Sequence, residues 1–147
     1  MARGTAGFTL LEILVVLVLL AVISAVGASR ISGSFDKRAM QQATGELSSM
    51  LRRARSRAIV SNEPVAVRVD VDAPSFSIPG ERPYKVSDRL KLTLFTAVTD
   101  RLAANVGEIR FFPDGSSTGG EVTLEGANAR HFVQVDWLTG RVAVYQQ

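Results

Sequence analysis

The feature that most constrains this chain is a nearly uninterrupted apolar run close to its start. Residues 8–26 are nineteen positions with a single charged side chain, Glu12. At about 1.5 Å of rise per helical residue the run would be roughly 29 Å long, close to the thickness of a bilayer's hydrocarbon core. The sequence therefore predicts a helix that spans a membrane.

The carboxylate of Glu12 needs a cationic partner in such a helix. A charge there costs on the order of 2.5–3.5 kcal/mol at the bilayer centre and less towards its edge. Helical neighbours lie three or four positions apart, whereas Arg3 is nine residues away. A cut after Gly7 would create a cation, because the new α-amino group of Phe8 is protonated near neutral pH. That amine can pair with Glu12 of its own chain or of a neighbour.

The start of the chain has a short basic leader ending in Gly7, then Phe8 and Thr9, and a glutamate, Glu12, heading the apolar helix. This pattern resembles the prepilin signature of type IV pilins and type II secretion pseudopilins. In that family a prepilin peptidase cuts after the glycine and methylates the new amine, and the glutamate registers each subunit in a helical filament. The resemblance implies cleavage between Gly7 and Phe8, N-methylation of Phe8 and a filament-assembly role for Glu12.

An ordinary signal peptide is the alternative interpretation. It too has a basic start, an apolar core and small residues before its cut, and residues 24–28 are small. However, Glu12 lies inside the apolar region, and that region is longer than the usual span of about 7–15 residues in a cleaved signal. Both features favour the prepilin interpretation over a signal peptide or a plain anchor.

Charge placement predicts the topology of the chain. Arg3 and the starting amine flank the apolar helix, and positive charge favours the cytoplasmic side. We therefore expect a single pass through a bacterial inner membrane, with the N-terminus cytoplasmic and the C-terminal domain periplasmic. The expected parts are a leader peptide at 1–7, a membrane and filament-core helix at 8–28, a periplasmic continuation of the helix at 29–62, and a periplasmic β-rich domain at 63–147.

Composition limits the other possibilities. A chain of 147 residues allows one modest domain besides the membrane helix. The net charge of +3 becomes +2 if Arg3 leaves with the leader, which is too small to indicate nucleic acid by itself. With no cysteine and a single histidine, His131, neither a disulfide framework nor a multi-histidine or thiolate metal site can form.

Apolar residues at helical spacing predict that the helix continues well beyond the apolar run. Glycines at positions 27, 33 and 45 predict bends or melted turns along it. Asn62, Glu63 and Pro64 should end it. The apolar residues in question are Ile31, Phe35, Ala39, Ala43, Leu47, Met50, Leu51, Ala54 and Ala58.

Beyond Pro64 the apolar period changes to two, which indicates strands. A looser stretch at 96–107 interrupts them, and short turns suggest antiparallel pairing, with Gly140 in the last hairpin. We expect an α+β fold in which a long N-terminal helix packs on a small antiparallel β-sheet or β-sandwich domain, as in pseudopilins. About seven strands are predicted, at 65–71, 76–78, 90–94, 109–112, 121–124, 130–137 and 141–145.

Four arginines form the densest charge cluster of the chain: Arg52, Arg53, Arg55 and Arg57. They are interpreted first as a solvated face near the helix C-terminus, where basic residues favour the helix dipole. A phosphate-binding patch for DNA, or a surface for an acidic partner, is the alternative. The absence of interleaved aromatic residues favours the solvated face.

Residues 115–119 satisfy the G-x-S-x-G pattern of hydrolase nucleophiles around Ser117. That motif needs a following helix, whereas a β-rich stretch follows here. No aspartate lies between Ser117 and His131, although Glu121 and Glu125 do. His131 is interpreted as a sheet residue. We expect no enzyme activity, no catalytic residue, no cofactor and no metal site.

Residues 111–120 and 135–142 resemble the C-terminal signature of the minor pseudopilin H and FimT-like prepilin family. The resemblance implies a minor pseudopilin of a type II secretion system, a structural subunit of the periplasmic pseudopilus that helps drive export of folded proteins across the outer membrane. The implied partners are the other minor and major pseudopilins, the prepilin peptidase and inner-membrane lipid.

Two alternatives stay open. One is a FimT-like type IV minor pilin acting in pilus assembly or DNA uptake, which would bind nucleic acid. The other is a membrane-tethered hydrolase, an interpretation that rests only on the G-x-S-x-G segment at residues 115–119, called the serine loop below. The C-terminus lacks the disulfide-closed loop of many type IV pilins, and this favours the type II secretion member.

Overall fold

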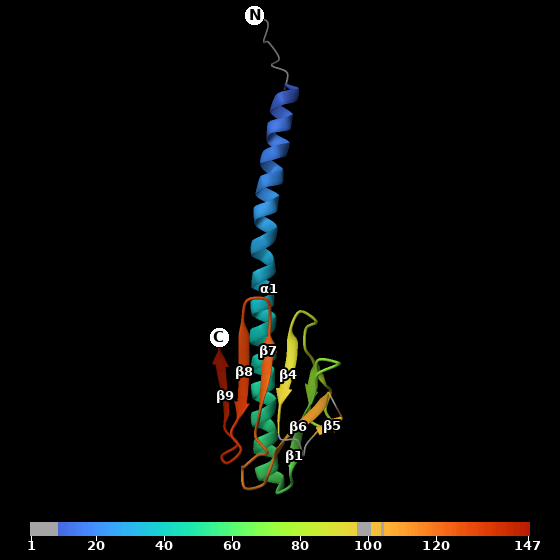
Figure 1. Ribbon diagram of the computed structural model, residues 1–147, viewed down its shortest axis with the longest axis vertical. Helices are drawn as coiled ribbons and strands as arrows, with labels where there is room; N and C mark the ends of the chain where they lie inside the picture. The colour runs from blue at the N-terminus through green and yellow to red at the C-terminus, as the bar shows by residue number, and fades with distance from the viewer. Residues whose placement is uncertain (1–8, 97–100, 104) are drawn as a thin grey trace, which may run out of the picture. The chain divides into compact units, whose positions relative to one another are not determined.

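The structure, a computed structural model, describes residues 9–96, 101–103 and 105–147 (Figure 1). The chain divides into two compact units, Met1–Phe35 and Asp36–Gln147. A single helix, α1 (Leu10–Ser61), has its first part in one unit and its second part in the other. The two units are described separately below.

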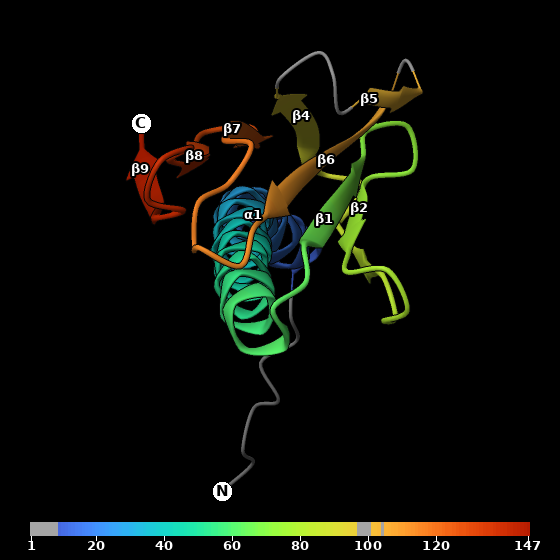
Figure 2. The same cartoon turned by 90° about the horizontal axis from the view of Figure 1, so that it is seen from below.

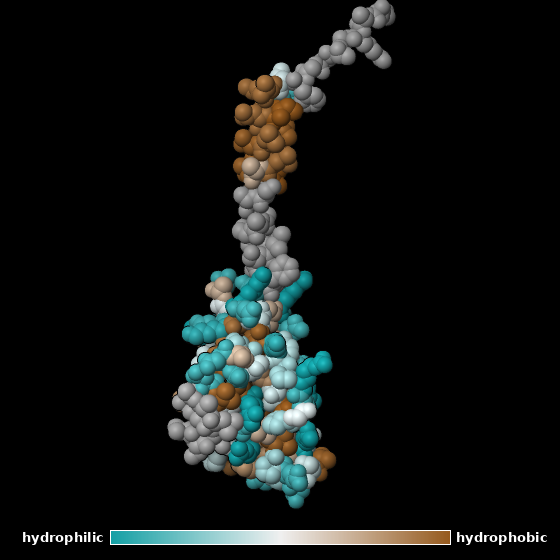
Figure 3. All heavy atoms as spheres, turned by 90° about the vertical axis from the view of Figure 1, so that its right-hand side faces the viewer, coloured by the Kyte–Doolittle hydropathy of each residue, from teal (hydrophilic) through white to brown (hydrophobic). Residues whose placement is uncertain are grey.

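The described part of the first unit is helical, and its side chains from Ile13 to Ile23 are all apolar; Figure 3 shows one face of this stretch. Every large apolar side chain from Leu10 to Ile23 is at least 46% exposed. A helix that is apolar all round is stable only in a nonpolar environment, either lipid or a bundle of other helices. Within the residues that the structure describes, no helix is both long enough and apolar enough to cross a membrane.

The prediction of melted turns at the glycines is wrong, because the backbone is helical at Gly27, Gly33 and Gly45. One glycine costs a helix only about 1 kcal/mol relative to alanine. At Gly45 that cost is small beside the burial of Ala43 and Leu47, whose side chains hold the helix on the core. The predicted end is confirmed, since α1 stops at Ser61 and Asn62 closes it with a positive φ of 53°.

Among the residues that the structure describes, the second unit adds nine strands to the last part of α1, and the pairings between these strands are antiparallel. A five-stranded sheet has the order β3-β2-β1-β6-β5 and a four-stranded sheet the order β4-β7-β8-β9. The strands of the first sheet are β1 (Val65–Asp70), β2 (Ser75–Ser77), β3 (Tyr84–Lys85), β5 (Arg101–Ala103) and β6 (Val106–Phe111). Those of the second are β4 (Lys91–Phe95), β7 (Gly120–Glu125), β8 (Arg130–Val135) and β9 (Val142–Gln146).

The two sheets together curve around one side of the second unit's part of α1, as Figure 2 shows in a view along the helix. The side chains of α1 that face the sheets are almost completely buried, and the inward side chains of both sheets meet them. The buried helical residues are Met40, Ala43, Leu47, Met50, Leu51, Ala54 and Ala58, and their partners include Val67, Val69, Phe76, Ile109, Phe111, Val122, Leu124 and Val133. The predicted fold class, a helix packed on antiparallel sheets, is confirmed.

Two strands escaped prediction, because β3 and β5 have only two and three residues, too few to show a period. Strand β6 also begins at Val106, ahead of the predicted start at 109. Its second residue, Gly107, interrupts the apolar pattern for a packing reason. A β-carbon there would lie 2.5 Å from Cδ2 of Leu94, so the Leu94 side chain would have to move to admit one. Residues 97–100 and 104 of the loose stretch lie outside the described residues.

We predict that a fragment of residues 29–147 folds alone and that Leu51→Ala destabilises it by about 2–5 kcal/mol, because the side chain is fully buried. The matched control is Val60→Ala on the same helix, where the side chain is 84% exposed. It should change the free energy of unfolding by no more than about 0.5 kcal/mol. Urea denaturation followed by circular dichroism measures both. An aggregated fragment, or equal losses in the two variants, would contradict this account of the core.

Candidate functional site

The N-terminal motif falls partly outside the described residues, since Gly7 and Phe8 are not among them. Thr9 lies just before α1, and its Oγ1 accepts a hydrogen bond of 3.3 Å from the N–H of Glu12. Threonine followed three residues later by glutamate is the capping-box pattern, and a carboxylate in the first turn also favours the helix dipole. The sequence analysis missed this cap, although the spacing was readable.

The side chain of Glu12 is exposed, and in the part of the chain that the structure covers no cation pairs with it. Its carboxylate is therefore available to a partner outside the described residues. The local cap explains the backbone contact of Glu12 but leaves its charge without a counter-ion among the described residues.

The four clustered arginines do not form one patch. Arg53 pairs with Glu46 at 3.6 Å, and its Nη1 donates a 3.0 Å hydrogen bond to Ser49 Oγ. Arg57 pairs with Glu81 at 3.4 Å. Exposed pairs of this kind contribute little to stability, but they neutralise the two arginines at their own sites. The solvated-face interpretation thus fits Arg53 and Arg57.

Arg55 has a structural role instead. It is partly buried, and its Nε donates a 3.0 Å hydrogen bond to the carbonyl oxygen of Gly115. A β-carbon at Gly140 would lie 2.8 Å from that same Nε, and one at Gly115 would lie 3.0 Å from Nη2. Both glycines also have positive φ, 83° at Gly115 and 60° at Gly140. Arg55 therefore joins α1 to the serine loop and to the β8–β9 turn, and both segments need glycine to let it in.

The serine loop does not form a hydrolase site. Ser117 is buried, and its hydroxyl donates a 3.1 Å hydrogen bond to the carbonyl oxygen of Asp136 while accepting one from the N–H of Gly119 at 3.0 Å. Strand β7 begins directly afterwards, at Gly120, in place of the helix that the motif needs. The serine instead ties the loop to the end of β8.

His131 is engaged elsewhere, between β8 and α1. Its Nδ1 lies 2.9 Å from Oγ1 of Thr44, and Ser48 Oγ donates a 2.8 Å hydrogen bond to the carbonyl oxygen of Thr44. All three side chains are buried. Burial lowers the pKa of His131 below its ordinary value of 6.5, because the charged imidazolium is poorly solvated there. The interpretation of His131 as a sheet residue with a satisfied polar atom is confirmed.

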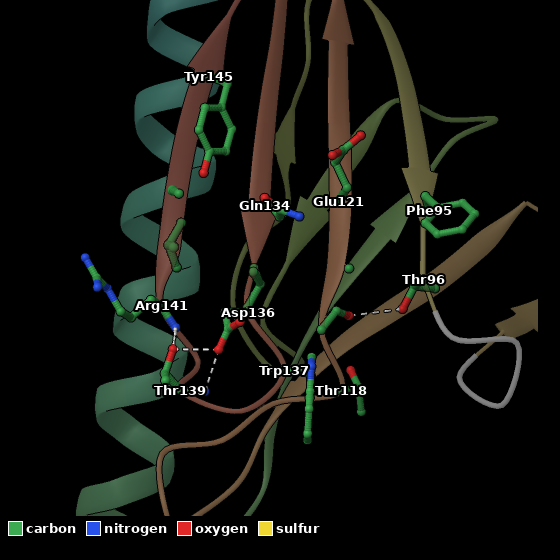
Figure 4. Close-up of a pocket in the computed structure, with 15 residues that line it drawn as sticks. Phe95, Thr96, Thr118, Glu121, Gln134, Asp136, Trp137, Thr139, Arg141 and Tyr145 are labelled. Atoms are coloured by element: carbon green, nitrogen blue, oxygen red, sulfur yellow. Dashed lines mark hydrogen bonds between the residues drawn. The ribbon is translucent and has the colours of Figure 1, made fainter.

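The outer face of the four-stranded sheet forms a wide groove of about 1150 Å³ (Figure 4). Phe95, Glu121, Gln134 and Ala143 are paired in register and make one row across its four strands. Three aromatic side chains border the groove, namely Phe95, Trp137 and Tyr145, which are 78%, 65% and 56% exposed. Exposed aromatic residues around a concave face are typical of protein–protein contacts.

One end of this groove is held rigid by the turn after β8. The carboxylate of Asp136 accepts hydrogen bonds of 2.7 Å from both the N–H and the hydroxyl of Thr139, and these bonds lower the pKa of Asp136 (Figure 4). The sequence analysis missed the groove. The sequence does show which residues of each strand point outward. It does not show which strands lie side by side, because that depends on the sheet order.

The fold is that of pilins and pseudopilins. The minor pseudopilin EpsH from the type 2 secretion system of Vibrio cholerae superposes with a TM-score of 0.56 and 13% identity, over 71% of this chain and 94% of that one. The type IV minor pilin FimU of Pseudomonas aeruginosa gives a TM-score of 0.55 and 17% identity, over 76% and 92% of the two chains. At such identities the likeness concerns the fold alone.

The sequence comparisons identify the family within that class. The family "Type II transport protein GspH" matches residues 43–139, and the prokaryotic N-terminal methylation motif matches residues 2–28. Type II secretion system protein H of Xanthomonas campestris pv. campestris is 31% identical over 140 residues, which is 95% of this chain and 83% of that protein. The chain belongs to the GspH family of type II transport proteins.

Family membership confirms the expected function, since the chain acts as a minor pseudopilin of a type II secretion system. A member of this family with the methylation motif is anchored in a membrane, has a periplasmic part and interacts with other pseudopilins. The family is one of structural subunits.

We predict that His131 makes stability depend on pH. The unfolded chain binds a proton at His131 at a higher pH than the folded chain does, so the free energy of unfolding should fall as the pH drops below about 6.5. Urea denaturation of the 29–147 fragment at pH 7.5 and 5.5 measures this. His131→Gln cannot titrate and should lack that part of the fall. Parallel pH profiles for the wild type and the variant would refute the assignment.

Proposed function

We propose that this minor pseudopilin is made as a prepilin and is cut between Gly7 and Phe8, and that the new amine of Phe8 is methylated by a prepilin peptidase. The match of the methylation motif to residues 2–28 supports this. So does the Gly-Phe junction ahead of Glu12. The mature chain then has a helix at 8–28 for the membrane and the filament core, a helical continuation at 29–62 and a β-rich domain at 63–147.

The helix at 8–28 lies in the bacterial inner membrane, crosses it once and leaves the C-terminal domain in the periplasm. The exposed apolar side chains from Leu10 to Ile23 support a lipid environment before assembly, since nothing in their own chain covers them. The basic leader supports a cytoplasmic N-terminus.

Glu12 registers the subunit in the pseudopilus by pairing with the Phe8 amine of a neighbouring subunit. The observation that supports this role best is the exposed, unpaired carboxylate of Glu12 within the described helix. A carboxylate surrounded by lipid or packed helices is costly without a counter-ion, so its pairing favours the assembled state over the isolated subunit. The aromatic groove on the four-stranded sheet supports further contact with sibling subunits.

A FimT-like minor pilin acting in pilus assembly or DNA uptake is the weaker candidate. The fold alone does not separate it, because a type IV minor pilin superposes as well as a pseudopilin does. The family match and the curated relative both favour type II secretion. Measuring DNA binding by residues 29–147 over a range of salt concentrations separates the two, since a DNA-uptake pilin should bind with a steep salt dependence.

Processing is tested by mass analysis of the N-terminus of the mature protein from membranes. We expect a chain that starts at Phe8 and carries one N-methyl group. The leader variant Gly7→Val should leave the precursor uncut, because the peptidase cuts after glycine in this family. A mature start near Ser29, as a signal peptidase would leave, would refute the proposal.

The assembly role of Glu12 is tested with three variants at equal membrane abundance. Glu12→Gln removes the charge but keeps a side chain that suits the capping box. Glu12→Ala removes both the charge and that side chain. Thr9→Val removes the cap but keeps the charge of Glu12. Since a charged hydrogen bond is worth about 1.5–3 kcal/mol, both Glu12 variants should reduce crosslinking to sibling pseudopilins about tenfold or more. Insertion and cutting should persist in both.

The capping variant is the control for this experiment. Thr9→Val should crosslink nearly as well as the wild type, because its carboxylate is intact. Loss of crosslinking in Thr9→Val and Glu12→Ala but not in Glu12→Gln would mean that Glu12 acts through the helix cap. Wild-type crosslinking in every variant would remove the assembly role altogether.

A further inference from the structure

Most arginines with a described side chain in the second unit have an acidic partner. Six of them lie within ion-pair distance of a carboxylate: Arg53 with Glu46, Arg57 with Glu81, Arg68 and Arg110 with the buried Glu108, Arg89 with Asp36, and Arg130 with Glu125. The arginines of this unit that form no such pair among the described side chains are therefore the candidates for binding an anion from outside.

Three arginines that form no ion pair within 4.0 Å among the described residues line a single hollow of about 380 Å³. They are Arg52 and Arg55 from α1 and Arg141, which lies directly before β9. Ser56, Ile59 and Val142 complete most of its wall. This arginine hollow brings together positive charges that are far apart in the sequence.

The arrangement is set by the fold. Arg52, Arg55, Ser56 and Ile59 are spaced by three, four and seven residues, so they share one face of α1. Arg55 is held in place by its hydrogen bond to Gly115, and it also lines the hollow. In Figure 4 the side chain of Arg141 extends away from the aromatic groove that its backbone borders. The arginines thus approach the hollow from two elements.

Three like charges around one hollow repel one another unless an anion joins them. The nearest acid in sequence to Arg141 is Asp136, whose carboxylate is bonded to Thr139 and whose pKa is lowered by those bonds and, to a lesser degree, by the charge of Arg141. Among the described residues, however, no ion pair joins the two side chains, and neither Arg52 nor Arg55 forms one either. Guanidinium groups match carboxylates in a two-pronged geometry and lose little hydration when they bind. The hollow therefore favours an anionic group supplied from outside the described residues.

A carboxylate fits the hollow better than the phosphates of nucleic acid do. A duplex needs a long stripe of unpaired basic residues, and the two arginines that would extend this one along α1, Arg53 and Arg57, are neutralised by Glu46 and Glu81. No aromatic side chain lines the hollow to stack on a base. Ile59 and Val142 instead offer an apolar wall to an aliphatic neighbour of the acid.

We propose that the arginine hollow formed by Arg52, Arg55 and Arg141 binds the carboxylate of an acidic segment on another protein subunit of the filament. Only the identity of that protein as a sibling pseudopilin rests on the proposed function. Arg52 and Arg141 contact the ligand. Arg55 contributes its charge while it fixes the wall of the hollow.

The test uses the full chain in detergent and a fluorescent peptide, acetyl-Leu-Glu-Glu-Leu-Glu-Glu-amide, with a matching peptide in which glutamine replaces each glutamate. Fluorescence anisotropy at low salt should show that the acidic peptide binds about tenfold or more tightly than its glutamine counterpart. The double variant Arg52→Gln with Arg141→Gln should lose that tenfold difference. Arg55 is left unchanged, because its removal would also disturb the serine loop.

The matched control is Arg38→Gln with Arg82→Gln. These two arginines also have no acidic partner among the described residues, but they do not line the hollow. The control removes the same net charge and should bind the acidic peptide within about twofold of the wild type. Equal weakening in both double variants would mean a nonspecific charge effect and would overturn the proposal.

Other outcomes are equally decisive. If the two peptides bind alike, the hollow does not select carboxylates. A labelled DNA duplex of about 20 base pairs and inorganic phosphate are each tested as competitors of the acidic peptide. If either competes, and the double variant of Arg52 and Arg141 no longer binds that competitor, the hollow is a phosphate site and the proposal fails. Co-purification of the wild type with other pseudopilins is measured in parallel. If the wild type does not co-purify with other pseudopilins but still binds the acidic peptide selectively, the proposed function is overturned and the carboxylate site is not.

Discussion

The structure depends above all on the burial of one apolar stripe of α1. From Met40 to Ala58 this stripe lies against the inward faces of both sheets, and its side chains are at most 3% exposed. Burial of this kind stabilises a domain by about 25 cal/mol for each Å² of apolar surface removed from water. The two sheets share no strand, so the helix is the element that makes them one core. The small alanines along the stripe let the strands approach it closely.

The same helix serves two environments because its pattern changes along its length. From Ile13 to Ile23 it is apolar on every side, whereas in the second unit its buried apolar side chains share the side that faces the sheets. The first pattern needs lipid or neighbouring helices, and the second needs a domain of its own. A pseudopilin needs both, since one end of it stays with the filament core or the membrane and the other presents a folded surface to its partners.

Arg55 explains why the C-terminal segments of the chain belong together. It links α1 to Gly115 in the serine loop and lies against Gly140 in the last hairpin, while Ser117 and the Asp136–Thr139 turn hold these segments from the other side. The residues that resemble a hydrolase motif are thus a structural junction. Two surfaces meet near it, the aromatic groove and the arginine hollow, and Arg141 and Val142 contribute to both.

The sequence by itself determined the long helix, its end at Ser61, most of the strands and the N-terminal methylation motif, because each depends on local periodicity, turn residues or a contiguous motif. It could not show that Gly107 accommodates Leu94, or that Arg55 leaves the helical cluster for Gly115. Nor could it show that Arg141 lies across a hollow from Arg52. Contacts between distant segments depend on sheet order and register, which only the tertiary structure decided. The sequence shows which residues are charged, but whether a charge is paired depends on which residues the fold brings beside it.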